Sequence, residues 1–137
     1  MMTPAQKKAW YSLAVVATCL AVLAALIPVL GPARAQGGFG VMGLLGFSQV
    51  LFRGRRGEIV NDERDDEIRR RATMISHVVF WIVFIQVGVA CPFIYGSNGA
   101  VPVLVVQYFL WLAFSLIVTV AAVATLVLYR LGRDDAA

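Results

Sequence analysis

The chain has 137 residues, of which 60% are hydrophobic and 15% are charged, whereas a soluble domain carries about 25% charged residues. Its mean hydropathy of +0.79 would make a soluble protein of this length expose a large apolar surface. These values argue against a soluble globular domain, a disordered chain and a fibrous chain, and they indicate an integral membrane protein.

Four apolar segments without Asp, Glu, Lys or Arg reach or approach the length that crosses a bilayer core, about 20 helical residues. A backbone in lipid must satisfy its own hydrogen bonds, so we expect each segment to be a helix. The sequence therefore predicts an all-α fold, an integral membrane four-helix bundle formed as a single transmembrane domain over residues 1–137. With their polar flanks, the predicted helices cover about residues 10–30, 36–52, 62–95 and 101–130.

The first helix, residues 10–30, also has features of a signal peptide. Lys7 and Lys8 precede it, and the small-x-small sequence of residues 33–35 follows it. Its apolar run of about 20 residues exceeds the 7–15 residues usual in a signal peptide. We therefore expect the helix to be retained, with cleavage after Ala35 as the alternative.

The second helix, residues 36–52, is short and rich in glycine. Its glycines are Gly37, Gly38, Gly40, Gly43 and Gly46. Small residues let membrane helices approach closely, so tight packing within the bundle is one interpretation. The alternative is that glycine carbonyls line a pore or substrate cleft, as broken helices do in transporters, with Gly40 and Gly43 as candidate positions.

The cytoplasmic loop, residues 53–71, is the only long polar stretch. It contains three acid–base pairs four residues apart with the acid first: Asp65/Arg69, Asp66/Arg70 and Glu67/Arg71. This is the favourable order for ion pairs on a helix. We therefore expect the third helix to begin near Asp62 and to project from the membrane. Ile68, Ala72 and Ile75 would continue an apolar seam into the membrane.

This projecting segment is either a solvated helix whose arginines set the topology or a docking surface for a partner. The candidate interaction residues are Asp62, Glu63, Arg64, Asp65, Asp66, Ile68 and Arg69. The arginines of residues 53–57 favour a topology anchor first and an anionic-lipid site second.

The triplet Asp62-Glu63-Arg64, followed by Ile68 and Ala72 and then by a transmembrane helix, resembles a motif of a family of small prokaryotic membrane proteins. Proteins of this family have four helices and occur in bacteria and archaea, and their function is unknown. The resemblance covers the loop and, loosely, the four-helix layout. It implies a membrane fold and brings no activity, substrate or site residue with it.

The distribution of charge predicts the orientation. Of the 12 basic residues, all except Arg34 flank the helices on one side, and all eight acidic residues lie on that same side. The positive-inside rule assigns this side to the cytoplasm, so both termini and residues 53–71 are expected there, in the cell membrane. Because the charges lie at helix ends, the net charge of +4 does not indicate nucleic-acid binding.

Few polar side chains lie inside the apolar segments. The candidates for an intramembrane polar or packing site are Gln49, His77 and Gln86, together with Gly40 and Gly43. A buried Gln in a membrane most often bonds a neighbouring helix, so structural roles are the simpler interpretation.

The sequence contains no recognisable catalytic set, metal motif or phosphate loop. We therefore expect no enzymatic activity, no cofactor and no metal. The first hypothesis is an accessory or regulatory subunit that acts through helix packing and its charged loop, with the lipid bilayer, a second copy or another membrane or cytoplasmic protein as its partner. The alternative is a small oligomeric channel or transporter built around the second helix. A lipid-modifying enzyme, with His77 as its only candidate residue, is a third possibility.

Overall fold

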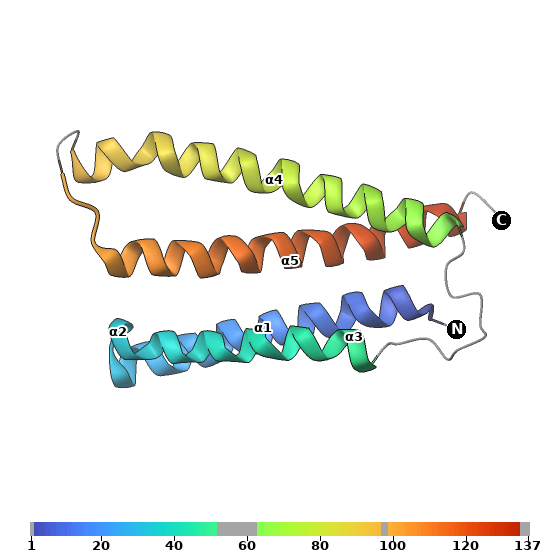
Figure 1. Cartoon of the computed structure of the whole chain (residues 1–137), viewed down its shortest axis with the longest axis horizontal. Helices are drawn as coiled ribbons and strands as arrows, with labels where there is room; N and C mark the ends of the chain where they lie inside the picture. The colour runs from blue at the N-terminus through green and yellow to red at the C-terminus, as the bar shows by residue number, and fades with distance from the viewer. Residues whose placement is uncertain (1, 52–62, 97–98, 135–137) are drawn as a thin grey trace.

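The computed structural model describes residues 2–51, 63–96 and 99–134, and their regular structure is entirely helical (Figure 1). The elements are α1 (Pro4–Leu30), α2 (Pro32–Ala35), the 3-10 helix η1 (Gln36–Phe47), α3 (Ser48–Leu51), α4 (Glu63–Tyr95) and α5 (Val103–Asp134). Of the described helices, α1, α4 and α5 are long and apolar enough to cross a membrane. The all-α fold is thus confirmed.

Helix α5 lies between α1 and α4 and packs against both of them, whereas η1 and α3 return along α1 (Figure 1). Helices α1 and α4 contact each other little. The start of α1, the start of α4 and the end of α5 lie together at one end of the bundle. This end, called the charged end below, carries Lys7, Lys8, residues 63–71 and Arg130.

Helix α1 begins well before the apolar stretch that starts at Trp10. Thr3 caps it, because the Thr3 hydroxyl accepts from the Gln6 N–H at 3.3 Å and the Gln6 side-chain oxygen accepts from the Thr3 N–H at 3.0 Å. This capping box satisfies two N–H groups that a helix start otherwise leaves without partners, and Pro4 fits the first helical position. The helix therefore extends about nine Å beyond its apolar part.

The predicted second helix is wound mainly as the 3-10 helix η1, in which residues three apart lie one above another. One face holds Gly37, Gly40, Gly43 and Gly46, and a second holds Phe39, Met42 and Leu45. A long 3-10 helix is uncommon because eclipsed side chains crowd each other, and a row of glycines removes that crowding from one face. Glycine at every third position of the sequence matches the three residues per turn of a 3-10 helix.

The 3-10 winding also gives the segment its length. Residues 36–51 reach about 30 Å, whereas an α-helix of the same residues would reach about 24 Å. The hydrocarbon core of a bilayer is about 30 Å thick. The segment is thus as long as the core is thick, although it has few residues.

The main core lies where η1 meets α1 and α5. Phe39, only 1% exposed, stacks on Trp111 of α5 with ring centroids 5.3 Å apart. On the α1 side, the Cys19 thiol donates to the Gly38 carbonyl oxygen at 3.6 Å. At the end of the bundle opposite the charged end, the Tyr108 hydroxyl donates to the Pro32 carbonyl oxygen at 2.8 Å. These contacts join η1 and the turn before it to α1 and α5.

Gly38 provides a test of this packing, because a Cβ atom there would lie 3.1 Å from Leu23 Cδ2 and 3.3 Å from Val22 Cγ1. We expect Gly38→Leu to destabilise the protein by about 1–3 kcal/mol through overpacking. Gly43→Leu is the matched control, because a Cβ at Gly43 meets nothing within 4 Å. Thermal unfolding in detergent measures both variants, and equal unfolding midpoints would contradict the close approach of η1 to α1.

Candidate functional site

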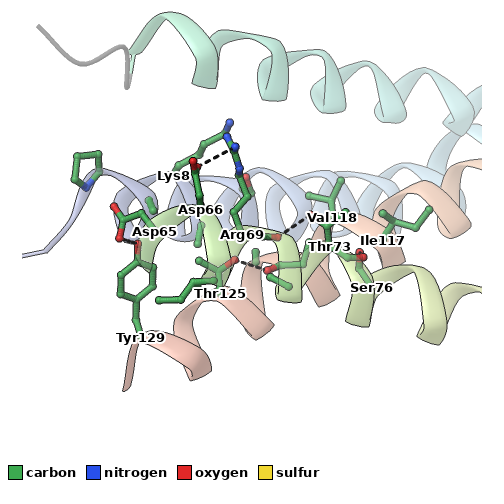
Figure 2. A pocket seen from close by; sticks show the side chains of 18 of the residues that line it. Lys8, Asp65, Asp66, Arg69, Thr73, Ser76, Ile117, Val118, Thr125 and Tyr129 are labelled. Carbon is green, nitrogen blue, oxygen red and sulfur yellow. Dashed lines mark hydrogen bonds and ion pairs between the residues drawn. The ribbon is translucent and has the colours of Figure 1, made fainter. Parts of the chain in front are cut away.

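A cavity of about 470 Å³ lies at the charged end between α1, α4 and α5 (Figure 2). Its volume lies in the range of about 300–1,000 Å³ found for small-molecule sites. Lys8, Asp65, Asp66 and Arg69 line its outer part together with Tyr129.

Small side chains on the facing helices leave this space open. Ala9 of α1, Ala72 of α4 and Ala121 and Ala122 of α5 all line the cavity. Helices α1 and α4 contact each other little, and the alanine methyl groups are too small to fill the gap between them. The cavity is therefore a consequence of alanine positions on three helices that are distant in the sequence.

The start of α4 has an inner and an outer face. Ile68, Ala72 and Ser76 are buried at four-residue spacing and line the cavity. Of the predicted seam, Ile68 and Ala72 lie on this inner face, whereas Ile75 is 42% exposed. The outer face carries charged side chains: Glu63, Glu67 and Arg70 are exposed.

Tyr129 connects the end of α5 to the start of α4. Its hydroxyl donates a hydrogen bond to Asp65 Oδ1, and the residue is only 8% exposed. Asp65 is therefore engaged by a tyrosine of another helix, where the sequence pattern predicted a pair with Arg69.

Two ion pairs form on α4 itself. The predicted pair Glu67/Arg71 is present, with 2.7 Å between Glu67 Oε1 and Arg71 Nε. Asp66 pairs with Arg69 at 3.0 Å, where the pattern predicted Arg70. Because Tyr129 binds Asp65, the Arg69 guanidinium is available to the next carboxylate along the helix. Both pairs are largely exposed, so each contributes little to stability.

The hydroxyl groups of the cavity wall donate to their own helices. Thr73 Oγ1 donates to the Arg69 carbonyl at 2.9 Å, Ser76 Oγ to the Thr73 carbonyl at 2.8 Å, and Thr125 Oγ1 to the Ala121 carbonyl at 2.7 Å. His77 Nδ1 lies 2.8 Å from the Thr73 carbonyl oxygen. A carbonyl only accepts, so Nδ1 carries the proton and Nε2 of the neutral ring is an acceptor. The inner wall thus offers acceptor atoms, while cations lie at the outer part.

The structure brings some of the candidate residues together. Asp65, Asp66, Ile68, Arg69 and His77 all line the cavity. Glu63 and Arg64 lie at the start of α4 and are exposed. Asp62 falls outside the described residues.

Other candidates lie apart from the cavity. Gly40 and Gly43 are on the outward face of η1, where neither would bring a Cβ within 4 Å of another residue. The interpretation that these two glycines pack inside the bundle is therefore wrong for contacts within the described chain. Gln86 is exposed on α4. Gln49 belongs to α3, but its side chain is outside the described part.

The sequence analysis missed the contributions of Lys8, Ser76 and Tyr129. The sequence placed Lys8 only in the flank of the first helix, as a signal-peptide feature and an orienting charge, and it carried no prediction of a site role for Ser76 or Tyr129. The spacing of Ile68, Ala72 and Ser76 could have identified the inner face of α4, because residues four apart share a helix face.

The side chains that line the cavity are of the kinds that bind a small ligand. Its outer part carries charges of both signs, and its inner part is lined by apolar residues such as Ile117 and Val118. Among the described residues, no three His, Cys, Asp or Glu side chains are grouped so that they could hold a metal ion.

A family model described as predicted membrane protein (DUF2178) matches residues 6–131. This match confirms the family-level resemblance and extends over nearly the whole chain. The Asp-Glu-Arg motif itself stays a prediction. No curated protein and no solved structure matches the chain.

The bond between Tyr129 and Asp65 can be tested by removing the hydroxyl. Tyr129→Phe leaves the half-buried Asp65 carboxylate without this donor, so we expect a loss of stability of about 1–3 kcal/mol. The amides of residues 63–72 should exchange hydrogen faster, as measured by mass spectrometry. Tyr95→Phe is the control, because the Tyr95 hydroxyl forms no hydrogen bond within the described ranges. Equal exchange in both variants would show that this bond does not hold α4.

Proposed function

The chain belongs to the predicted membrane protein family DUF2178, and from this premise we propose that it is a non-enzymatic membrane subunit that binds another membrane protein. In this role it is an accessory or regulatory protein. It contacts its partner through the exposed surface of α4 in the membrane and through the outer charged face of the same helix.

The proposed arrangement is a four-helix membrane bundle with η1 and α3 as the fourth crossing and with both termini in the cytoplasm. Its support is the collection of basic residues at one end of the bundle, where α1 and α4 begin and α5 ends. Among the described residues, Arg34 is the only basic residue at the opposite end. Such asymmetry is the pattern of the positive-inside rule.

The observation that carries the proposal is the exposure of Gln86. Residues 81–89 of α4 are all exposed, although Phe84 contacts Phe109 of α5 on one side of the helix. Gln86 lies about 21 Å along the helix from Ala72, within the apolar stretch. A polar amide in lipid is costly unless it has a hydrogen-bond partner, and the Gln86 amide has none among the described residues. A partner helix with a polar side chain at this depth would supply that bond.

The outer face of α4 at the charged end extends this surface into water. Glu63, Glu67 and Arg70 are exposed there, and they lie on the same helix as Gln86. Charged residues at the rim of an interface mainly set partner choice and orientation. Asp65 and Asp66 are poorer candidates for this contact, because both line the cavity and not the outer face.

The test is affinity purification from native membranes in mild detergent, with quantitative mass spectrometry of the proteins recovered. We expect Gln86→Leu to lower the yield of a near-stoichiometric partner by roughly three- to tenfold, the effect of one interhelical hydrogen bond in a membrane. Alanine at Glu63, Glu67 and Arg70 together should lower it further.

Val29→Leu is the control for Gln86→Leu, because Val29 is an exposed apolar residue of α1, outside the proposed α4 surface. Its partner yield should equal that of the wild type. Recovery of only this chain from all samples, with no second protein, would reject the accessory role.

The glycine face of η1 favours a second candidate, a small oligomeric channel or transporter. Gly37, Gly40, Gly43 and Gly46 leave one side of this helix without side chains, and a Cβ at any of them would meet no described residue within 4 Å. In an oligomer such a face would expose backbone carbonyls, which form ion and substrate sites in broken transporter helices.

Flux through liposomes tests this second candidate. If η1 lines a pathway, Gly40→Leu and Gly43→Leu should each abolish most of the solute or ion flux, because the leucine side chain would occupy the pathway. The substitutions should leave folding intact, since both positions open onto free space. Wild-type liposomes without flux above empty liposomes would reject the channel.

A further inference from the structure

The cavity at the charged end is elongated along the helices. On α4 it runs from Asp65 to His77, and on α5 from Tyr129 to Ile117. Each of these stretches is about 18 Å long. Figure 2 shows Asp65 and Tyr129 at one end of the cavity, and Ser76 and Ile117 toward the other.

The polarity of the wall changes along this length. The outer part carries two cations, Lys8 and Arg69, and two carboxylates, Asp65 and Asp66. Lys8 forms no ion pair within the described residues. The inner part is lined by apolar side chains such as Ile117, and by hydroxyl and imidazole groups that bond to carbonyls of their own helices. A ligand that fits this wall has charges of both signs at one end and an apolar body at the other.

The position of the cavity indicates where such a ligand comes from. The inner part lies along the apolar stretches of α4 and α5, which are candidate membrane spans. Helix α1 lines the cavity only as far as Ser12, about 12 Å from Pro4. Because α1 and α4 contact each other little, packing between these two helices does not seal the inner part from the bilayer.

We infer that the cavity binds one phospholipid with a zwitterionic ethanolamine headgroup. Its phosphate binds Lys8 and Arg69, its ammonium group binds the carboxylates of Asp65 and Asp66, and an acyl chain lies along Ile117. Arg69, Asp65 and Asp66 keep their contacts within the chain, because a guanidinium has five donors and a carboxylate about four acceptor sites. The two carboxylates disfavour a lipid with a net negative headgroup, because they would repel it. They favour a primary ammonium over a quaternary one, because only the primary ammonium donates hydrogen bonds.

This site is separate from the proposed partner surface. Gln86 and Glu67 do not line the cavity, and Lys8 is not part of the outer face of α4. A failure to capture a partner and a failure to bind lipid are therefore distinguishable results.

The test uses the full-length protein, purified in detergent and freed of native lipid. Phosphatidylethanolamine, phosphatidylcholine or phosphatidylglycerol is added at equal concentration, and native mass spectrometry counts the lipid molecules bound. We expect one bound phosphatidylethanolamine, with the other two lipids bound about tenfold more weakly, the effect of losing one charge-assisted hydrogen bond.

Two variants locate the site. Lys8→Ala should weaken binding of phosphatidylethanolamine about tenfold through loss of the phosphate contact. Lys7→Ala is the matched control, because Lys7 is exposed and lies outside the cavity. Ala121→Leu should abolish binding by filling the cavity, with its thermal unfolding measured to show that it is folded.

Equal binding of the three lipids would overturn the inference, as would preferential binding of phosphatidylglycerol. Unchanged binding in Lys8→Ala, or in a folded Ala121→Leu, would also overturn it, because the lipid would then lie elsewhere on the protein.

Discussion

The bundle depends on α5, because α1 packs against one side of this helix and α4 against another, while α1 and α4 contact each other little. Toward the end opposite the charged one, Trp111 of α5 stacks on Phe39 and so holds η1. At the charged end, Tyr129 of α5 binds Asp65 and so holds α4. Helix α5 therefore joins α4 to the pair formed by α1 and η1, and the cavity is the space that this arrangement leaves between α1 and α4.

The long helices were predictable because a membrane limits what an apolar chain can do. A charge-free run of about 20 residues has few alternatives to a helix in lipid, and α1, α4 and α5 all contain such a run. The start of α1 was harder to predict, since it depends on Thr3 and Gln6, which lie outside the apolar run. The winding of η1 was visible as glycine at every third residue, but a period of three is easily taken for loose α-helical spacing.

The candidate site was only partly predictable for a different reason. The pattern of charged residues identified Asp65, Asp66 and Arg69 as candidates, and these residues do line the cavity. The cavity itself arises where alanines of three helices face each other, and a single sequence does not say which helix faces which. The role of Tyr129 has the same origin, because its partner Asp65 is 64 positions away along the chain.

The winding of η1 has a mechanical consequence. Converting its 12 residues from 3-10 to α geometry would shorten the segment by about 6 Å without changing its sequence. Hydrophobic mismatch costs fractions of a kcal/mol per Å, and most helices can reduce it only by tilting, by kinking or by deforming the bilayer. If η1 crosses the bilayer as proposed, it has a further way to reduce mismatch, because membrane thickness would then set how tightly η1 is wound. Through Gly38 and Phe39, any such change would reach α1 and α5.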